Sequence, residues 1–162
     1  MKKLNKKELP YDADDFVNIV SITKNDKCVS VNNDEIIVNC KSLQDVDYCA
    51  KILDLILNKG ASVVGLDYMD FINKSGTAEY DFDLVEDIAI DNFSEDINKM
   101  ELSVNAKNII YIVGNISPSD ATNVMDEIIS IWEQEILLGL IYDEEYPENM
   151  FDIYIWKERL YK

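Results

Sequence analysis

The chain has 162 residues and is strongly acidic, with 32 Asp+Glu against 15 Lys+Arg and a formal charge of −17 at pH 7. This length allows one domain to bury a sizeable core. The charge disfavours nucleic acid, because a protein that neutralises phosphates needs a basic surface, and it disfavours an anionic membrane surface for the same reason. Histidine is absent, which excludes Ser–His and Cys–His nucleophiles and histidine-ligated metal sites.

The cysteines and the apolar runs indicate the compartment. Cys28, Cys40 and Cys49 are odd in number and lack CxxC spacing, which argues against a zinc site and a disulfide framework and suits a reducing environment. No apolar run approaches the roughly 18–20 residues of a membrane span. The basic start is not followed by the apolar stretch of a secretory signal. We therefore expect a cytoplasmic protein without membrane insertion.

The first 14 residues differ in character from the rest of the chain. They are polar, show no periodic pattern and carry four lysines before Pro10, so we expect residues 1–14 to form a flexible basic arm and residues 15–162 a single domain. Beyond the arm, β-branched runs predict three short strands around one turn cluster: Phe16–Ile22, the turn Lys24–Lys27, Cys28–Val31 and Ile36–Cys40.

Ser42 begins the longest predicted helix. It is a good N-cap, Asp45 favours the positive helix end, and Gly60 supplies a stop, so we expect a helix within residues 42–60. Apolar residues recur at helical spacing at Leu43, Val46, Ala50, Leu53, Ile56 and Leu57. Because Cys49 and Ile52 lie off that stripe, this helix should be substantially buried.

The elements after residue 60 follow from the same patterns. In chain order we expect a short helix near Gly65–Ile72, a strand at Thr77–Asp83, a helix at Leu84–Phe93, a strand at Asn108–Val113, a helix at Ser117–Trp132, and strands at Ile136–Tyr142 and Phe151–Trp156. The short connector predicts that the last two strands pair as a hairpin. The fold expected is α+β: a two-layer sandwich of a mixed four-stranded sheet with helices on one face, preceded by the short strands and the long helix.

Four segments together point to a known family, namely Val63–Phe71, Ser75–Ala78, Ala106–Asn115 and Ser117–Glu133. They resemble, in order, the synergy loop of the FtsZ/tubulin family, its Gly-Thr-Ala strand, its Ala-Lys-Gly strand segment and the amphipathic helix that follows. The family's strand before the central helix, its central helix, its next strand and its closing strand are similar to Val17–Lys27, Ser42–Leu57, Ile136–Glu145 and Phe151–Trp156. The resemblance thus covers about residues 16–158 and rests on the ordered set rather than on any one motif. It implies the second half of an FtsZ-like protein, with the central helix and the activation domain, and hence a cytoskeletal role in cell division.

The nucleotide-binding half of that family has no counterpart here. The chain has five glycines, at positions 60, 65, 76, 114 and 139, and no two are close enough to build a phosphate cradle. The acidic residue with which the family's central helix reads guanine corresponds to Lys51, which has the wrong charge. We therefore expect no GTP binding by this chain alone, no cofactor and no enzymatic activity of its own.

Asp67 and Asp70 are the candidate functional acids. The resemblance matches them to two carboxylates that, in the family, reach into the GTP site of the next subunit and position the attacking water. The spacing equally suits an ordinary helix start, with Asp67 as N-cap and Asp70 at N3. The residues expected to contact a partner are Gly65, Leu66, Tyr68 and Phe71. Gly65 replaces the family's Asn, which removes an amide that contacts the neighbour's nucleotide.

The remaining acids and aromatics have simpler interpretations. The acids group as Glu79, Asp81, Asp83, Glu86 and Asp87, and as Asp143, Glu144, Glu145, Glu148 and Asp152. Neither group has EF-hand spacing, so we interpret both as solvated faces and expect no metal site. Tyr80, Tyr154 and Trp156 either form an exposed aromatic patch or, as is more usual for strand residues, pack against a neighbouring element.

The leading functional hypothesis is a nucleotide-free FtsZ-like protein that contacts a filament-forming FtsZ/tubulin-type GTPase, or associates with itself. It would either cap the filament or supply Asp67 and Asp70 in trans. An alternative is a small-molecule-binding or oligomerisation module that reuses the scaffold, since fold does not imply function. A stand-alone carboxylate enzyme is the least favoured hypothesis, because no acid has an obvious desolvating pocket and no histidine can serve as base.

Overall fold

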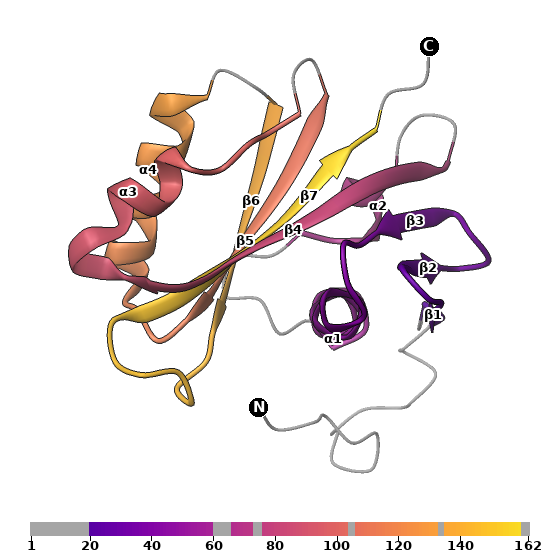
Figure 1. Cartoon of the computed structure of the whole chain (residues 1–162), viewed down its shortest axis with the longest axis horizontal. Coiled ribbons are helices and arrows are strands. Elements are labelled where there is room, and N and C mark those ends of the chain that lie inside the picture. Colours follow the sequence, from indigo (N-terminus) through magenta and orange to yellow (C-terminus); the bar gives the residue numbers. More distant parts are fainter. Residues whose placement is uncertain (1–19, 60–65, 73–75, 104–105, 133–134, 160–162) are drawn as a thin grey trace, which may run out of the picture.

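A seven-stranded mixed β-sheet runs through the molecule (Figure 1). The computed structural model describes residues 20–59, 66–72, 76–103, 106–132 and 135–159. In spatial order the strands are β1 (Ile22–Lys24), β2 (Cys28–Val31), β3 (Ile36–Asn39), β4 (Ala78–Ala89), β7 (Met150–Glu158), β5 (Lys107–Gly114) and β6 (Glu135–Tyr142). The helices are α1 (Leu43–Leu57), α2 (Tyr68–Phe71), the 3-10 turn η3 (Ile90–Asn92), α3 (Phe93–Asn98) and α4 (Pro118–Ile131). The general α+β class is confirmed.

The two long helices begin where their capping residues predict. The Ser42 hydroxyl accepts a hydrogen bond from the Asp45 amide at 3.1 Å, and the Ser117 hydroxyl accepts one from the Asp120 amide at 3.1 Å. Pro118 takes the first helical position of α4, where its missing N–H leaves no donor unsatisfied. Local capping chemistry therefore sets both helix starts.

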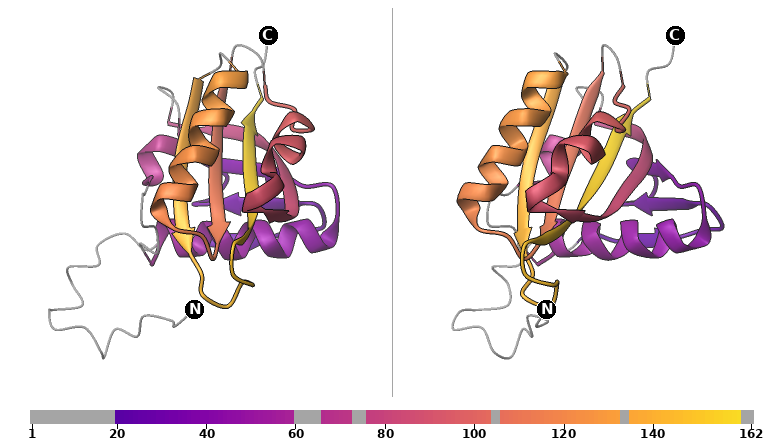
Figure 2. Two further views of the ribbon diagram at one scale, coloured as in Figure 1. Left: turned by 90° about the vertical axis from the view of Figure 1, so that its left-hand side faces the viewer. Right: turned by 60° about the vertical axis from the view of Figure 1, so that its left-hand side comes forward.

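Helices cover both faces of the sheet, so the expectation of helices on one face is wrong (Figure 2). Helix α1 packs on one face, where its apolar stripe meets strand residues of the same core. Helices α3 and α4 pack on the other. The α1-side core includes Val46, Leu53, Tyr80, Phe82, Tyr111, Tyr154 and Trp156, and the α4-side core includes Ile97, Ile110, Ala121, Val124, Ile128, Phe151, Ile153 and Ile155.

The predicted helix at Leu84–Phe93 is also wrong, because β4 continues to Ala89 before η3 and α3 begin. Strand β4 pairs with β7 in one register up to Val85 and in a register shifted by one residue from Ile88 onward. Asp87 lies in this β-bulge with a left-handed φ of 58°. The extra residue breaks the strand alternation, so that the apolar spacing of Val85, Ile88 and Ala89 imitates a helical stripe.

The predicted hairpin between β6 and β7 does not form. Strand β7 lies between β4 and β5 and is antiparallel to both, while β6 is parallel to β5 and lies at the sheet edge. Helix α4 provides the crossover that a parallel β5–β6 pair requires. The expected four-stranded sheet is not confirmed, because the sheet has seven strands: β3 pairs parallel with β4 and adds the three short strands.

Trp156 lies at the centre of the α1-side core. Its side chain is fully buried and has edge-to-face contacts with Phe71 and Tyr111 at centroid distances of 5.8 and 6.2 Å. Its indole N–H points to the Cys49 sulfur of α1 at 3.4 Å. A buried aromatic of this size contributes strongly to stability and fixes neighbouring rings. The exposed aromatic patch considered for Tyr80, Tyr154 and Trp156 is therefore absent, because all three side chains are buried.

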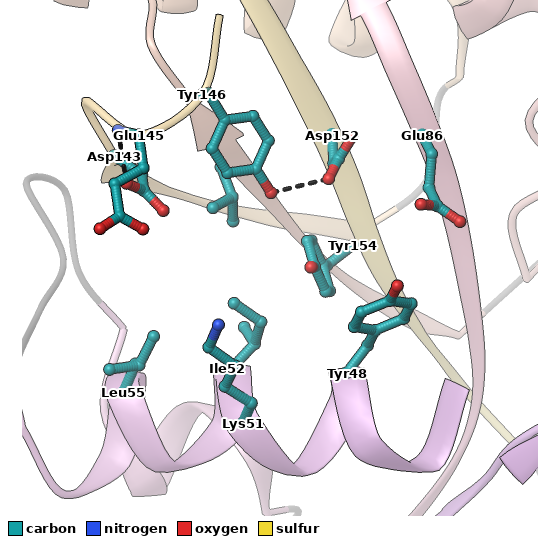
Figure 3. A pocket seen from close by; sticks show the side chains of 11 residues that line it. Tyr48, Lys51, Ile52, Leu55, Glu86, Asp143, Glu145, Tyr146, Asp152 and Tyr154 are labelled. Atoms are coloured by element: carbon teal, nitrogen blue, oxygen red, sulfur yellow. Dashed lines mark hydrogen bonds between the residues drawn. The ribbon is translucent and has the colours of Figure 1, made fainter. Parts of the chain in front are cut away.

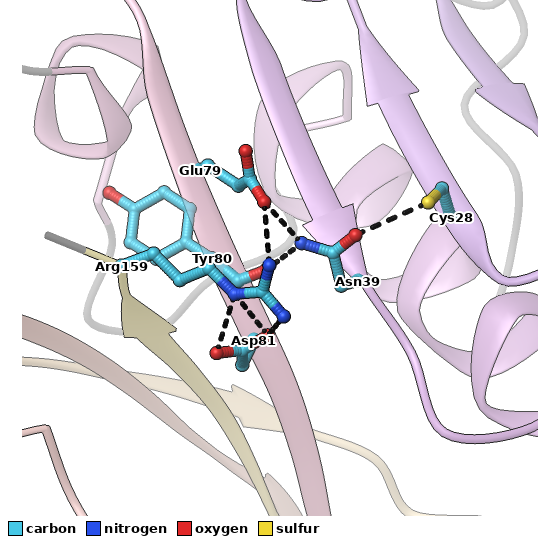
Figure 4. A network of polar contacts seen from close by, with 6 residues as sticks. All are labelled: Cys28, Asn39, Glu79, Tyr80, Asp81 and Arg159. Atoms are coloured by element: carbon cyan, nitrogen blue, oxygen red, sulfur yellow. Dashed lines mark hydrogen bonds and ion pairs between the residues drawn. The ribbon is translucent and has the colours of Figure 1, made fainter. Parts of the chain in front are cut away.

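A polar network joins the N-terminal strands to the rest of the sheet (Figure 4). Arg159, the one arginine of the sequence, binds both carboxylate oxygens of Asp81 through Nε at 2.8 and 2.9 Å and reaches Glu79 at 3.1 Å. The Asn39 amide of β3 donates to the same Glu79 carboxylate at 2.7 Å. The expected arm, and most of the strand expected at Phe16–Ile22, lie outside the described residues.

Candidate functional site

Residues 66–72 comprise α2 and the residues that flank it, and are here called the α2 tip. Aromatic side chains pack the α2 tip against the sheet. Phe71 is fully buried, with edge-to-face contacts to Tyr80 at 6.1 Å and to Trp156 at 5.8 Å. The Tyr80 hydroxyl donates to the Phe71 carbonyl at 2.5 Å, and the Leu66 amide donates to the Tyr111 hydroxyl at 2.8 Å. The α2 tip is therefore held at both ends by core residues.

A buried lysine completes this anchorage. Lys107, at the start of β5, is only 9% exposed, and its ammonium donates to the carbonyls of Asp70 at 2.6 Å and Ile72 at 3.3 Å. These carbonyls belong to the C-terminal end of α2, where orphan acceptors and the helix dipole favour a positive charge. The charge of Lys107 thus holds the tip in place.

The two candidate acids form a capping box. Asp67 accepts hydrogen bonds from the amides of Met69 at 2.9 Å and Asp70 at 3.3 Å, and the Asp70 carboxylate accepts one from the Asp67 amide at 2.8 Å. The carboxylate of each acid thus accepts a hydrogen bond from the backbone amide of the other. The helix-capping interpretation of these acids is therefore realised in the geometry, and a role toward a partner's nucleotide stays a prediction.

The residues expected to contact a partner fall into different environments. Gly65 lies outside the described residues, Leu66 and Tyr68 are half-buried, and Phe71 belongs to the core. Tyr68 donates its hydroxyl proton to Glu35, and partial desolvation together with that carboxylate raises the pKa of Tyr68. The most exposed apolar side chain of the tip is Met69, at 68%, which the sequence pattern did not single out.

A second candidate site is a cavity between α1 and the chain that connects β6 to β7 (Figure 3). Its volume is about 240 Å³, which is smaller than the sites that hold drug-sized ligands. Four carboxylates, three tyrosines and one lysine supply its polar groups. The lining residues are Tyr48, Lys51, Ile52, Leu55, Glu86, Val113, Asp143, Glu145, Tyr146, Asp152 and Tyr154.

Asp152 is the most buried carboxylate of this cavity. It is 9% exposed, accepts the Tyr146 hydroxyl proton at 2.7 Å and accepts the Asp87 amide at 2.8 Å. The bulge in β4 is what aims the Asp87 amide at it. Within the described ranges, no lysine or arginine forms an ion pair with Asp152. The cavity therefore holds a buried carboxylate supported by neutral donors.

The electrostatic field of the cavity is negative. Burial and the charge of Asp152 raise the pKa of Tyr154, and burial with the hydrogen bond to Asp152 raises the pKa of Tyr146. Desolvation and the neighbouring Asp152 and Asp87 raise the pKa of Glu86. Such a field attracts a cation, and the tyrosine rings add faces that favour one. In the described part of the chain, no group of three or more acidic or cysteine side chains is spaced to hold a metal ion.

Sequence reasoning missed this cavity because its parts are distant in the chain. The sequence pattern predicts a solvated face for Asp143, Glu145 and Asp152 and a helix for Glu86. The one available signal was Asp152 itself, an acid within an apolar strand between Phe151 and Ile153. It indicated a special environment only once β7 was known to be central in the sheet.

Comparison with models of protein families finds no match, and comparison with curated protein sequences finds no significant match. None of the helices in the described ranges is long and apolar enough to cross a membrane.

The capping box gives a direct test of the tip. Replacing Asp67 with Ala removes the side-chain acceptor and should destabilise α2 by about 1 kcal/mol. The Met69 and Asp70 amides should then exchange with solvent roughly fivefold faster. Asp67→Asn keeps an acceptor oxygen and should change the exchange rates much less. Hydrogen exchange measured by NMR decides this, and equal rates in Asp67→Ala and wild type would contradict the capping geometry.

Proposed function

We propose that this chain is a nucleotide-free partner of an FtsZ/tubulin-type GTPase and that it docks on a filament subunit through the α2 tip. The resemblance of the sequence over residues 16–158 motivates the proposal. The order of the elements supports it, because the long helix α1 precedes the mixed strands β4 to β7, as the resemblance implies.

One observation supports the docking role: the backbone of the α2 tip is anchored to the sheet, while part of its surface is exposed to solvent. Phe71 and Lys107 hold the backbone, so little conformational entropy is lost when a partner binds. Met69 presents a large apolar side chain to solvent beside the exposed Asp67. An anchored tip of this kind is suited to insertion into a partner's surface.

The same geometry favours capping of the filament over donation of acids. The carboxylates of Asp67 and Asp70 already accept backbone hydrogen bonds within the tip, so a partner's water competes with those donors. The sequence contains no glycine-rich loop of the kind that binds phosphate. We therefore propose a non-catalytic role, in which binding of this chain blocks addition of the next GTPase subunit.

Sedimentation of filaments tests the proposal. An excess of the chain should reduce the amount of the native cell's FtsZ/tubulin-type GTPase that pellets with GTP. Met69→Glu should weaken this effect about tenfold, because it places a charge at the centre of the contact. Leu43→Glu is the matched control, since Leu43 is 66% exposed on α1, outside the tip. Unchanged pelleting and unchanged GTP hydrolysis at excess wild-type chain would refute the proposal.

One further double variant distinguishes filament capping from donation of the acids in trans. Asp67→Asn with Asp70→Asn removes both charges but keeps oxygen acceptors for the cap. Filament capping should survive this pair. Loss of an effect on GTP hydrolysis, with binding retained, would instead support donation of the acids in trans.

The cavity favours a second candidate function, the binding of a small organic cation. Three tyrosines and four carboxylates surround a space of about 240 Å³, and Lys51 is the one cation among the lining residues. Aromatic faces and carboxylates together are the chemistry that recognises quaternary ammonium groups. This function would be that of a small-molecule-binding module that uses the same scaffold.

Choline and its uncharged isostere 3,3-dimethyl-1-butanol test this second function by NMR titration. Choline should shift the Tyr48, Tyr146 and Tyr154 resonances, and the isostere should not.

Glu86→Gln should weaken choline binding by about 0.5–1 kcal/mol, roughly two- to fivefold, and Lys51→Gln should strengthen it by removing a like charge. Because the pKa of Glu86 is raised, its attraction for a cation should fade at a higher pH than that of an ordinary glutamate as the solution is acidified. Equal shifts with both ligands would exclude cation recognition.

A further inference from the structure

Two of the three cysteines lie in the α1-side core. Strands β3 and β4 are paired up to Asn39 and Asp81. The next residue of each strand, Cys40 and Phe82, is turned to the α1 side, where its side chain is buried. Cys49 enters the same core from α1 and has no exposed surface. The sheet and the helix therefore each contribute one thiol to this core.

The two thiols are joined by a hydrogen bond. The Cys49 thiol donates to the Cys40 sulfur, and the Trp156 indole N–H donates to the Cys49 sulfur at 3.4 Å. The hydrogen bond from Cys49 lowers the pKa of Cys40, whereas burial and the same hydrogen bond raise the pKa of Cys49. Cys40 also keeps 8% exposure. Because the thiolate is the reactive form of cysteine, Cys40 is the nucleophile that an oxidant meets first.

The third cysteine, Cys28, lies on the opposite face of the sheet. It is the β2 partner of Asn39, and its thiol donates to the Asn39 side-chain oxygen at 3.3 Å (Figure 4). Since successive side chains of a strand alternate between its faces, Cys40 projects away from Asn39 and Cys28. Cys28 is also more exposed than Cys40. The chain thus contains its own control thiol, which an oxidant reaches but which lies apart from the other two.

We propose that Cys40 and Cys49 are a redox-sensitive pair that closes to a disulfide when hydrogen peroxide reaches the chain. The Cys40 thiolate attacks one peroxide oxygen, so that a sulfur–oxygen bond forms while the oxygen–oxygen bond breaks. The hydroxide that leaves takes up the proton lost by Cys40 and becomes water. The product at Cys40 is a sulfenic acid, with Cys49 beside it as the resolving thiol.

The second step forms the disulfide. The Cys49 sulfur gives up its proton and attacks the Cys40 sulfur, so that the sulfur–sulfur bond forms while the sulfur–oxygen bond breaks. Hydroxide leaves and takes up that proton as water. Two thiols and one hydrogen peroxide thus give one disulfide and two waters, and the two electrons lost by the sulfurs reduce the peroxide.

The disulfide is a covalent tie between the end of β3 and α1. It acts on the turn of α1 that also carries Tyr48, a residue of the cavity. Exchange with a thiol reductant opens it again, so the tie is reversible. The proposal is independent of the GTPase partner and of ligand binding in the cavity.

Peptide mapping of the full chain after peroxide treatment tests the pair. The remaining thiols are alkylated, and the chain is digested with trypsin without reductant. Trypsin separates residues 28–41 from residues 42–51, so Cys40 and Cys49 fall on different peptides. We expect the two peptides to be linked, with a mass two hydrogens below their sum, in material that runs as a monomer in non-reducing electrophoresis. Absence of the linked species, or its presence only in a cross-linked dimer, would overturn the proposal.

Cys28→Ser is the matched control, because Cys28 shares its tryptic peptide with Cys40. This variant leaves both members of the proposed pair in place, and the yield of the linked species should not change. Loss of the link in Cys28→Ser would show that Cys28 forms the bond, and the proposed pair would then be wrong.

The indole N–H signals of the two tryptophans provide a measurement on the wild-type chain. Trp156 donates to the Cys49 sulfur, so its signal should shift on oxidation and return when dithiothreitol is added. Trp132 packs against the α4-side core and is the reference, whose signal should move little. Equal shifts of both signals, or a shift of neither, would contradict a bond formed beside Trp156.

Discussion

The position of β7 between β4 and β5 is the constraint on which the rest of the structure depends. Its residues Phe151–Trp156 are all buried, because the strand has neighbours on both sides and a helical layer on both faces. Burial on both faces explains why apolar side chains continue without clear alternation along this strand. Because β7 lies between β4 and β5, β6 pairs with the other side of β5 and is the last strand of the sheet.

Each proposed site follows from that arrangement. Trp156 of β7 supplies the surface on which Phe71 packs, so the α2 tip is anchored by the central strand and by Lys107 of β5. Asp152 and Tyr154 face α1 from the same strand and give the cavity its carboxylate and an aromatic wall. The α2 tip and the cavity thus both depend on side chains of the central sheet that are turned toward α1.

The helix starts could be predicted from the sequence, because they depend on interactions between residues that are close together in the chain. Ser42 and Ser117 marked the starts of α1 and α4, and the capping role of Asp67 was recognisable from its spacing to Asp70. The errors arose where distant segments decide the outcome. The bulge at Asp87 imitated a helical stripe, and the insertion of β7 replaced an expected hairpin. The cavity was not predictable for the same reason, since its lining comes from α1, β4, β5, β7 and the β6–β7 connection.

The most direct test of this account is a set of backbone nuclear Overhauser effects across the sheet in the isotope-labelled chain. The strand order requires contacts of Tyr154 with Tyr111 of β5 on one side and with Leu84 of β4 on the other. Observation of both sets of contacts would establish β7 as the central strand. Cross-strand contacts between β7 and β6, as in a hairpin, would contradict it, and with it the anchored tip and the cavity.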